Sequence, residues 1–287
     1  MAKRKNRLRY LVLIFASWWV IYPIATSVQE SFEIDLGPLY SGRGVSFVGQ
    51  FFQGTGGLMP TAINYLQAFR IEAWPRLVFN SSIIALSSVS IALIVGIPAA
   101  YSFAMYKYRG KTILTIGLLA LRTISPFAVL VPFFIVYGQL GLFDTFQGMA
   151  IIYLVLNLPI VILMMRGFFK DIPKEIYEAA FLSGASDMTI MRRIALPLVI
   201  PGMVAVVLFA FVATWNEYLY ALILTGARSK TVSRGVWSGF GESIEGFKIL
   251  DFDELNTAGT LALIPAIVIV LLVRKYLVRG VSLGAAK

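Results

Sequence analysis

The sequence contains neither cysteine nor histidine among its 287 residues. Without cysteine the chain can form no disulfide and has no thiolate nucleophile. Without histidine it lacks the commonest general base and the commonest ligand of catalytic metals. Most hydrolytic mechanisms and zinc sites therefore lack their usual residues, and we expect no catalytic residue and no metal site in this chain.

Charged residues are scarce as well. They make up 14% of the chain, whereas hydrophobic residues make up 58%, and a typical soluble domain has about 25% charged residues. The net charge of +10 would suggest nucleic-acid binding in a soluble protein, but no nucleic-acid-binding motif is visible. The composition instead predicts an all-α polytopic membrane protein that forms a single transmembrane domain over residues 1–287.

Six apolar blocks are long enough to cross the hydrocarbon core, which takes about 20 residues of α-helix. They predict six transmembrane helices at residues 10–28, 78–106, 112–138, 147–165, 198–224 and 257–273. The first block follows a basic start, as in a signal peptide, but it exceeds the roughly 7–15 residues of a signal-peptide core. We interpret it as an uncleaved first span.

Positive charge is distributed unevenly between the predicted loops. Seventeen of the 25 Lys and Arg residues lie at the two ends of the chain and in the segments 107–111 and 166–193. Because basic residues accumulate on the cytoplasmic side of a membrane, we expect both termini and both of these segments to be cytoplasmic. The loops 29–77, 139–146 and 225–256 are then external.

The loop 170–197 joins two of the predicted spans and shows helix-end signals. Asp171 and Pro173 suit the start of a helix. Gly184 suits its end, where a positive φ angle is common, and Ser186 can cap a second short helix. The spacing i, i+3, i+4 predicts one small, mildly apolar face on the first helix, made of Ile176, Ala179, Ala180 and Ser183. An ordinary solvated loop with interfacial helices would explain the capping alone.

The same loop matches the pattern EAA-x3-G-x9-I-x-LP at every fixed position. The matching residues, with the alanine that follows the glycine, are Glu178, Ala179, Ala180, Gly184, Ala185, Ile194, Leu196 and Pro197. This resembles the EAA loop of permease subunits of prokaryotic ATP-binding-cassette (ABC) importers. The resemblance implies that these residues couple the chain to a separate ATPase. Many relatives have Asp before the glycine, where this chain has Ser183, and this difference affects one local polar contact.

Further segments extend the resemblance over most of the chain, among them GIPAAYS at 96–102, LGL at 140–142 and WNEY at 215–218. Together they resemble the MalG-like permeases of carbohydrate importers. The resemblance implies the type I ABC importer permease fold (MetI/MalG-like), with a core transmembrane domain over about residues 78–276. It also implies a multi-pass protein of the prokaryotic inner or plasma membrane.

The same resemblance implies the transported solute and the partners. The solute would be a sugar or an oligosaccharide. The partners would be a second, non-identical permease subunit, two ABC ATPase subunits that bind ATP and Mg, and an extracytoplasmic sugar-binding protein. The external loop 225–256 is too long for a simple turn, and our hypothesis is that it contacts the binding protein.

Two ionisable residues, Arg122 and Glu217, lie well inside predicted spans, where such groups usually face a cavity or a partner. Trp215, Asn216 and Tyr218 flank Glu217. Aromatic rings and planar polar groups are the side chains that bind sugars, so these five residues are candidates for the substrate pathway. The structural alternative is that Glu217 pairs with a basic residue or seals the dimer interface.

Two other classes of function are a secondary carrier and a membrane enzyme. An ion-coupled secondary carrier could use Glu217 as its ion site, but such carriers often contain internal repeats, and we find none. A membrane enzyme would need clustered catalytic groups, which are missing from the predicted spans. The segment 109–112 ends like a phosphate loop, but that motif requires glycine where Met105 stands. We therefore expect no ATP hydrolysis by this chain.

Overall fold

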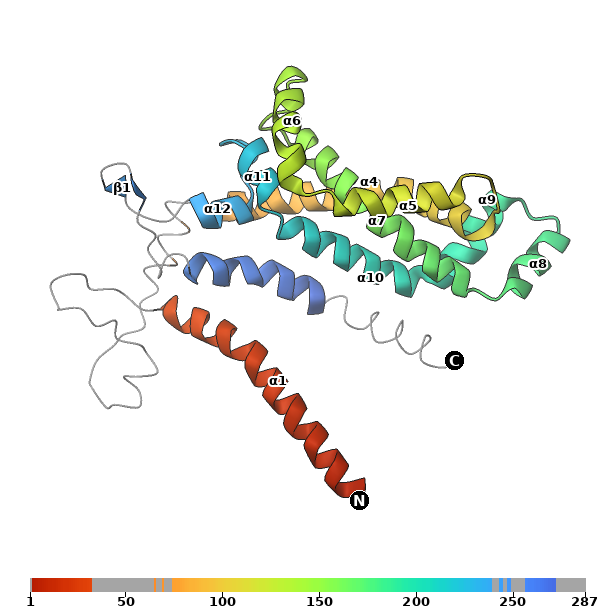
Figure 1. Cartoon of the computed structure of the whole chain (residues 1–287), viewed down its shortest axis with the longest axis horizontal. Helices are drawn as coiled ribbons and strands as arrows, with labels where there is room; N and C mark the ends of the chain where they lie inside the picture. Colours follow the sequence, from red (N-terminus) through yellow and green to blue (C-terminus); the bar gives the residue numbers. More distant parts are fainter. Residues whose placement is uncertain are drawn as a thin grey trace. The chain divides into compact units, whose positions relative to one another are not determined.

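The computed structural model describes residues 2–32, 65, 69, 74–238, 243–244, 247–248 and 256–271. This part is almost entirely helical (Figure 1). Its two strands, β1 (Ser243–Ile244) and β2 (Phe247–Lys248), pair antiparallel. Contacts divide the chain into two compact units: Met1–Pro75 with Gly235–Ile264, and Arg76–Arg234 with Pro265–Lys287. The expected single domain over residues 1–287 stays a prediction.

The first unit contains α1 (Ala2–Glu30), a helix of 29 residues that includes the first predicted span. Its apolar section is Leu13–Gln29. A second apolar helix, Asn256–Leu271, belongs to this unit up to Ile264. Phe15, Trp18 and Trp19 are exposed on α1, as expected for a helix whose surroundings are apolar. The Thr257 hydroxyl donates to the Ser31 carbonyl at 3.1 Å, which ties the two helices together at one end.

The other helices follow in chain order: α4 (Trp74–Met105), α5 (Lys111–Thr123), α6 (Pro126–Gln139), α7 (Phe146–Asp171), α8 (Lys174–Leu182), α9 (Asp187–Thr189), η2 (Ile190–Ala195), α10 (Leu196–Trp215), α11 (Leu219–Leu224) and α12 (Val232–Ser238). The segments α9, η2 and α10 form one continuous apolar helix, Asp187–Trp215. In the second unit, α8 and α9 lie at one end and α6 and α11 at the other (Figure 1).

Three helices of the second unit are long and apolar enough to cross a membrane: α4, α7 and the helix Asp187–Trp215. They correspond to the predicted spans at 78–106, 147–165 and 198–224, but the last of these is shorter than predicted. Its helix ends at Trp215, and α11 is a separate element. With the bent pair α5–α6 and the two shorter apolar helices, every predicted block is helical in the described residues. The number of membrane crossings stays a prediction.

The predicted span at 112–138 is broken in the structure. It consists of α5 and α6, which meet at an angle of 91°. Ile124 and Ser125 between them are both extended, with ψ angles of 123° and 128°. Pro126 explains the break, because a proline disfavours the helical conformation of the preceding residue and fits the first turn of a new helix.

The long helices of the second unit approach one another closely at two glycines. A Cβ atom on Gly96 would lie 2.6 Å from the side chain of Val161, and one on Gly202 would lie 2.5 Å from the ring of Phe168. No larger residue fits without a shift at either place. Small residues of this kind allow the close van der Waals packing that associates helices in membranes.

Candidate functional site

The loop after α7 has the predicted helix–turn–helix form. Gly184 ends α8 with a φ angle of +81°, and the Ala185 amide donates to the Ala180 carbonyl at 3.2 Å. Ser186 caps the second helix by accepting from the Thr189 amide at 3.4 Å. The predicted capping role of Asp171 is wrong, because Asp171 is the last residue of α7 and α8 begins after Pro173.

The predicted face of α8 is divided between the interior and the surface. Ala180 is buried beside Tyr177 in the same hydrophobic cluster as the end of α7, and the Tyr177 hydroxyl donates to the Phe169 carbonyl at 3.2 Å. Ala179 and Ser183 are exposed. Tyr177 packs in the cluster that includes Phe169 of α7. Ala180, three residues later on α8, faces the same side of the helix and is buried with it.

The exposed surface of the loop is nevertheless apolar. Leu182 is 90% exposed, and Phe181 and Met188 are exposed by about half. Glu178 is exposed beside them. Large apolar side chains gathered on an exposed turn usually mark an interaction site. We call the set Glu178, Ala179, Phe181, Leu182 and Met188 the docking surface.

The remaining residues of the motif attach this surface to the bundle. Ile194 and Leu196 pack against the core cluster, and Ala185 does so from the turn. Pro197 is exposed near the start of α10. Because η2 continues into α10 without a break, the docking surface is attached to a single helix that runs through the second unit.

A tyrosine after α4 also holds the loop. Burial, and then a hydrogen bond that the Tyr106 hydroxyl donates to the Asp187 carboxylate, raise the pKa of Tyr106 to about 12. Tyr106 follows Met105, the last residue of α4, and Asp187 begins α9. The contact connects the end of α4 to the loop.

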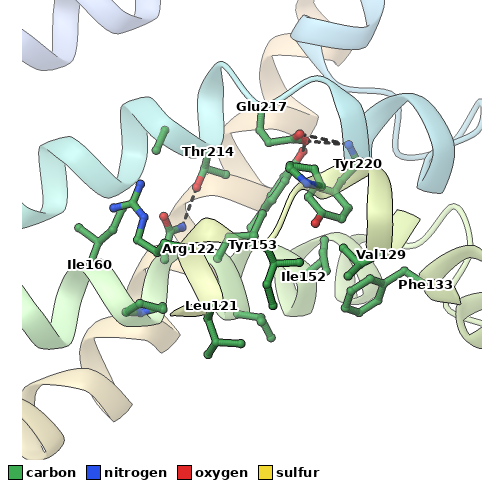
Figure 2. Close-up of a pocket in the computed structure, with 17 residues that line it drawn as sticks. Leu121, Arg122, Val129, Phe133, Ile152, Tyr153, Ile160, Thr214, Glu217 and Tyr220 are labelled. Carbon is green, nitrogen blue, oxygen red and sulfur yellow. Dashed lines mark hydrogen bonds between the residues drawn. The ribbon is translucent and has the colours of Figure 1, made fainter. Parts of the chain in front are cut away.

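At the opposite end of the second unit, a cavity of about 430 Å³ lies between α5, α6, α7, α10 and α11. Both predicted intramembrane charges, Arg122 and Glu217, line it. Figure 2 shows Arg122 and Ile160 toward one end of this cavity and Glu217 and Tyr220 toward the other. The rest of the wall is mainly apolar and includes Val129, Phe133, Ile152 and Leu156.

The three other pathway candidates do not line the cavity. Trp215 is only 3% exposed and stacks on Phe211, with ring centroids 5.6 Å apart. The Asn216 amide turns back to donate to the Val212 carbonyl at 3.1 Å, and Tyr218 lies outside the lining residues. These three residues therefore lie apart from the cavity, and their part in the substrate pathway stays a prediction.

Glu217 has well-defined partners. Its carboxylate accepts from the Tyr153 hydroxyl at 2.9 Å and from the Tyr220 amide at 3.1 Å. The Ala221 amide donates to it at 3.3 Å. Glu217 thus satisfies free amides at the start of α11, where a negative charge is favourable.

The cavity also contains polar residues that the sequence analysis did not identify. Tyr153 and Asn157 lie on one face of α7, and the Asn157 amide donates to the Thr214 hydroxyl at 2.7 Å (Figure 2). The signal that could have found them is the spacing of four residues between two polar groups in an apolar span. Their pairing with Thr214 and Glu217, which lie 57 and 64 residues away along the chain, has no local signal.

A second unpredicted feature lies just before the first residue of α7. Asp144, at a φ angle of 53°, accepts from the backbone amides of Gly226 at 2.7 Å, Arg228 at 3.0 Å and Ser229 at 2.8 Å. Burial disfavours its charge, but these bonds outweigh the burial, and the pKa of Asp144 lies below its ordinary value. We call this arrangement the Asp144 clasp.

The described residues contain no group of three or more acidic side chains that could hold a metal ion. What the structure brings together is a docking surface at one end, a cavity with a polar wall at the other, and a continuous helix between them. This arrangement can transmit a movement, and it can offer hydrogen bonds to a small polar molecule.

Comparison with known proteins finds a family and many relatives that match most of the chain. The sequence profile of the family described as "binding-protein-dependent transport system inner membrane component" matches residues 61–283. A probable ABC transporter permease from Sinorhizobium fredii is 33% identical, over 79% of this chain and 80% of that protein. The permease SugB of a trehalose transport system from Mycobacterium tuberculosis is 33% identical, over 81% of this chain and 85% of that protein.

Among solved structures, a bacterial ABC transporter that imports the acidic polysaccharide alginate contains a similar chain. The TM-score is 0.69 at 21% identity, and the match covers 95% of this chain and 96% of that chain. A likeness at this level of identity concerns the fold.

Proposed function

Because this chain belongs to the family of binding-protein-dependent transport system inner membrane components, we propose that it forms half of the pathway by which an importer moves a sugar or an oligosaccharide. The chain is a membrane-embedded, non-catalytic permease subunit of an ABC importer, and a separate ATPase hydrolyses ATP. No cofactor binds to this chain in the proposal, since ATP and Mg bind to the ATPase.

The observation that carries the proposal is the continuity between the docking surface and the cavity. The helix Asp187–Trp215 begins in the loop 170–197, which we call the coupling loop. Thr214, near the other end of this helix, lines the cavity. When the ATPase moves the docking surface, this helix moves as a rigid body and changes the wall of the cavity. Closely packed helices can convert a small shift at one end into a switch between two arrangements of the whole bundle.

The chemistry of the cavity supports a saccharide as the solute. A volume of about 430 Å³ lies within the range of small-molecule sites, about 300–1,000 Å³. Tyr153, Asn157 and Thr214 supply hydroxyl and amide groups, and Phe133 supplies an aromatic ring. Of the relatives, one is named for trehalose and a structural neighbour for alginate, and both names denote carbohydrates.

The partners in this proposal are a second, non-identical permease subunit, two ATPase subunits and an external sugar-binding protein. The orientation in the proposal has both termini and the docking surface in the cytoplasm. The loop 225–256, expected to contact the binding protein, lies partly outside the described residues. The ion-coupled carrier has no support, because the family match favours the importer.

The proposed function can be tested by reconstituting the complete importer with its binding protein in liposomes. We expect uptake of a radiolabelled sugar from outside to require both ATP inside and the sugar-loaded binding protein. Uptake that continues without ATP, and that follows a proton or sodium gradient, would overturn the proposal in favour of the carrier.

A further inference from the structure

The segment 225–231, between α11 and α12, is held by side chains from other parts of the second unit. It forms no regular helix or strand, so its backbone polar groups need partners from elsewhere. The Asp144 clasp accepts from three of its amides. On α4, the Asn80 amide donates to the carbonyls of Arg228 at 3.1 Å and Lys230 at 2.9 Å. The segment is therefore fixed from two sides.

A further bond to α4 fixes the point where α12 begins. The Ser81 hydroxyl accepts from the Val232 amide at 2.8 Å. Asn80 and Ser81 are both buried, and buried hydrogen-bond networks stiffen a structure when their groups are satisfied. We call the segment 225–233, with these contacts, the brace.

Ser233, the second residue of α12, links the brace to the cavity. Its hydroxyl donates to the backbone carbonyl of Glu217 at 2.6 Å. Glu217 lies in the break between α10 and α11, where the backbone has left the helix and its carbonyl needs a partner outside it. Ser233 therefore fixes the backbone from which a cavity-lining carboxylate extends.

The contacts of this carboxylate depend on the position of its backbone. Glu217 accepts from the Tyr153 hydroxyl at 2.9 Å and from the Tyr220 amide at 3.1 Å (Figure 2). Hydrogen bonds between two oxygen atoms are about 2.5–3.0 Å long, so a shift of the backbone by roughly 1 Å would break the bond to Tyr153. Releasing Ser233 thus changes the polar wall of the cavity.

We propose that Ser233 is a positioning residue, which holds Glu217 in place at the cavity although Ser233 itself lies outside the lining residues. The inference rests on the proposed function, in which the cavity receives the solute. Asn80, Ser81 and the Asp144 clasp give Ser233 a rigid support. The segment after α11 thus affects how a solute is bound without touching it.

Infrared spectroscopy of the purified full chain tests the position of Glu217 without any solute. The carboxyl band of Glu217 is identified as the band that is lost in Glu217→Gln, and its frequency reports the hydrogen bonds of that carboxyl group. Ser233→Ala removes the donor to the Glu217 carbonyl, whereas Ser233→Thr keeps a hydroxyl group. The matched control is Ser88→Ala, which removes a buried hydroxyl of α4 that donates to the Ala85 carbonyl of its own helix.

We expect Ser233→Ala to shift the Glu217 band in the same direction as Tyr153→Phe. Ser233→Thr should restore the wild-type frequency, and Ser88→Ala should leave it unchanged. Ser81→Ala, which frees the amide next to Ser233, should shift the band in the same direction by a smaller amount. A Ser233→Ala variant that unfolds at a lower temperature but keeps the wild-type band would overturn the proposal, since Ser233 would then be structural only.

The reconstituted importer gives a second measurement, the amount of sugar taken up per ATP hydrolysed. A variant that only reduces the number of folded complexes lowers uptake and hydrolysis in proportion. We expect S233A instead to lower uptake per ATP by about fivefold, the factor that corresponds to one hydrogen bond, and S233T to restore it. An unchanged ratio in S233A would contradict the role in solute binding. A wild-type chain without any ATP-dependent uptake would overturn the proposed function, whereas the infrared result would still decide whether Ser233 positions Glu217.

Discussion

Glu217 holds two helices together and also lines the cavity. Its carboxylate joins α7 to α11 through Tyr153 and the Tyr220 amide, and it lines the cavity at the same time. A buried carboxylate with several hydrogen-bond donors is stable as a structural group. In the proposed function, a sugar hydroxyl group would replace the Tyr153 hydroxyl as a hydrogen-bond donor to Glu217.

The substitution Glu217→Gln keeps an acceptor for the start of α11 but removes the negative charge. Hydrogen bonds to charged groups contribute about 1.5–3 kcal/mol, so we expect a lower thermal midpoint and slower uptake. Uptake should still depend on ATP. The measurements are thermal unfolding of the purified chain and sugar uptake by the reconstituted importer. The exposed substitution Tyr22→Phe in α1 serves as the control, and unchanged stability and uptake in E217Q would contradict the role given to Glu217.

The Asp144 clasp gives a prediction of pH dependence. Since the pKa of Asp144 is lowered in the folded chain, the clasp contributes stability above the ordinary pKa of about 3.9. That contribution is lost as the pH falls through the lower folded value. Asp144→Asn should therefore lower the thermal midpoint at pH 7, and the difference from wild type should shrink below about pH 4.

Thermal unfolding at a series of pH values checks this prediction, with Asp171→Asn as the control, because Asp171 is exposed at the end of α7. A difference between wild type and D144N that stays constant down to pH 3 would mean that the charge of Asp144 does not hold the clasp.

At the scale of elements, the coupling loop depends on the turn between α8 and α9. Gly184 adopts a φ angle of +81°, which costs other residues about 1–2 kcal/mol. Gly184→Val should displace the docking surface while leaving the long helices intact, so ATPase binding falls and secondary structure is retained. Pull-down of the ATPase and circular dichroism measure the two effects. Gly167→Ala is the matched control, since a Cβ atom there meets nothing within 4 Å; equal ATPase binding by G184V and G167A would contradict the prediction.

The packing of α7 against α10 depends on Gly202. A leucine at this position would overlap the ring of Phe168, and overpacking of this kind costs about 1–3 kcal/mol. We expect Gly202→Leu to lower the thermal midpoint and the double variant F168A/G202L to recover part of the loss. Additive losses in the double variant would show that the two residues do not compete for the same space.

The elements also show what could and could not be predicted from the sequence. Hydropathy located the apolar helices, and the glycine and serine signals located the turn of the coupling loop, because these are local properties. The break at Pro126 has a local signal in the proline itself, but hydropathy does not show it, because an apolar run gives the same hydropathy whether the helix is straight or broken. The polar wall was only partly predicted: Arg122 and Glu217 stand out as charges, whereas Tyr153 and Thr214 reach the cavity through contacts between distant segments.

At the scale of the whole molecule, the absence of cysteine makes orientation directly measurable. Leu182 is highly exposed on the docking surface, and Ala227 is exposed beside the Asp144 clasp. We expect Leu182→Cys to react with a membrane-impermeant maleimide only in inside-out vesicles, and Ala227→Cys only from the outside of intact cells. Labelling of both from the same side would contradict the proposed orientation.

The central claim is that this chain is moved by a separate ATPase through its coupling loop. The most direct measurement is mass spectrometry of the proteins that co-purify with the full tagged chain from native membranes, compared with the same chain carrying Gly184→Val. The account predicts that an ATPase with an intact phosphate loop accompanies the wild-type chain and is lost from the variant. A wild-type chain that purifies without any ATPase, under conditions that preserve membrane complexes, would contradict it.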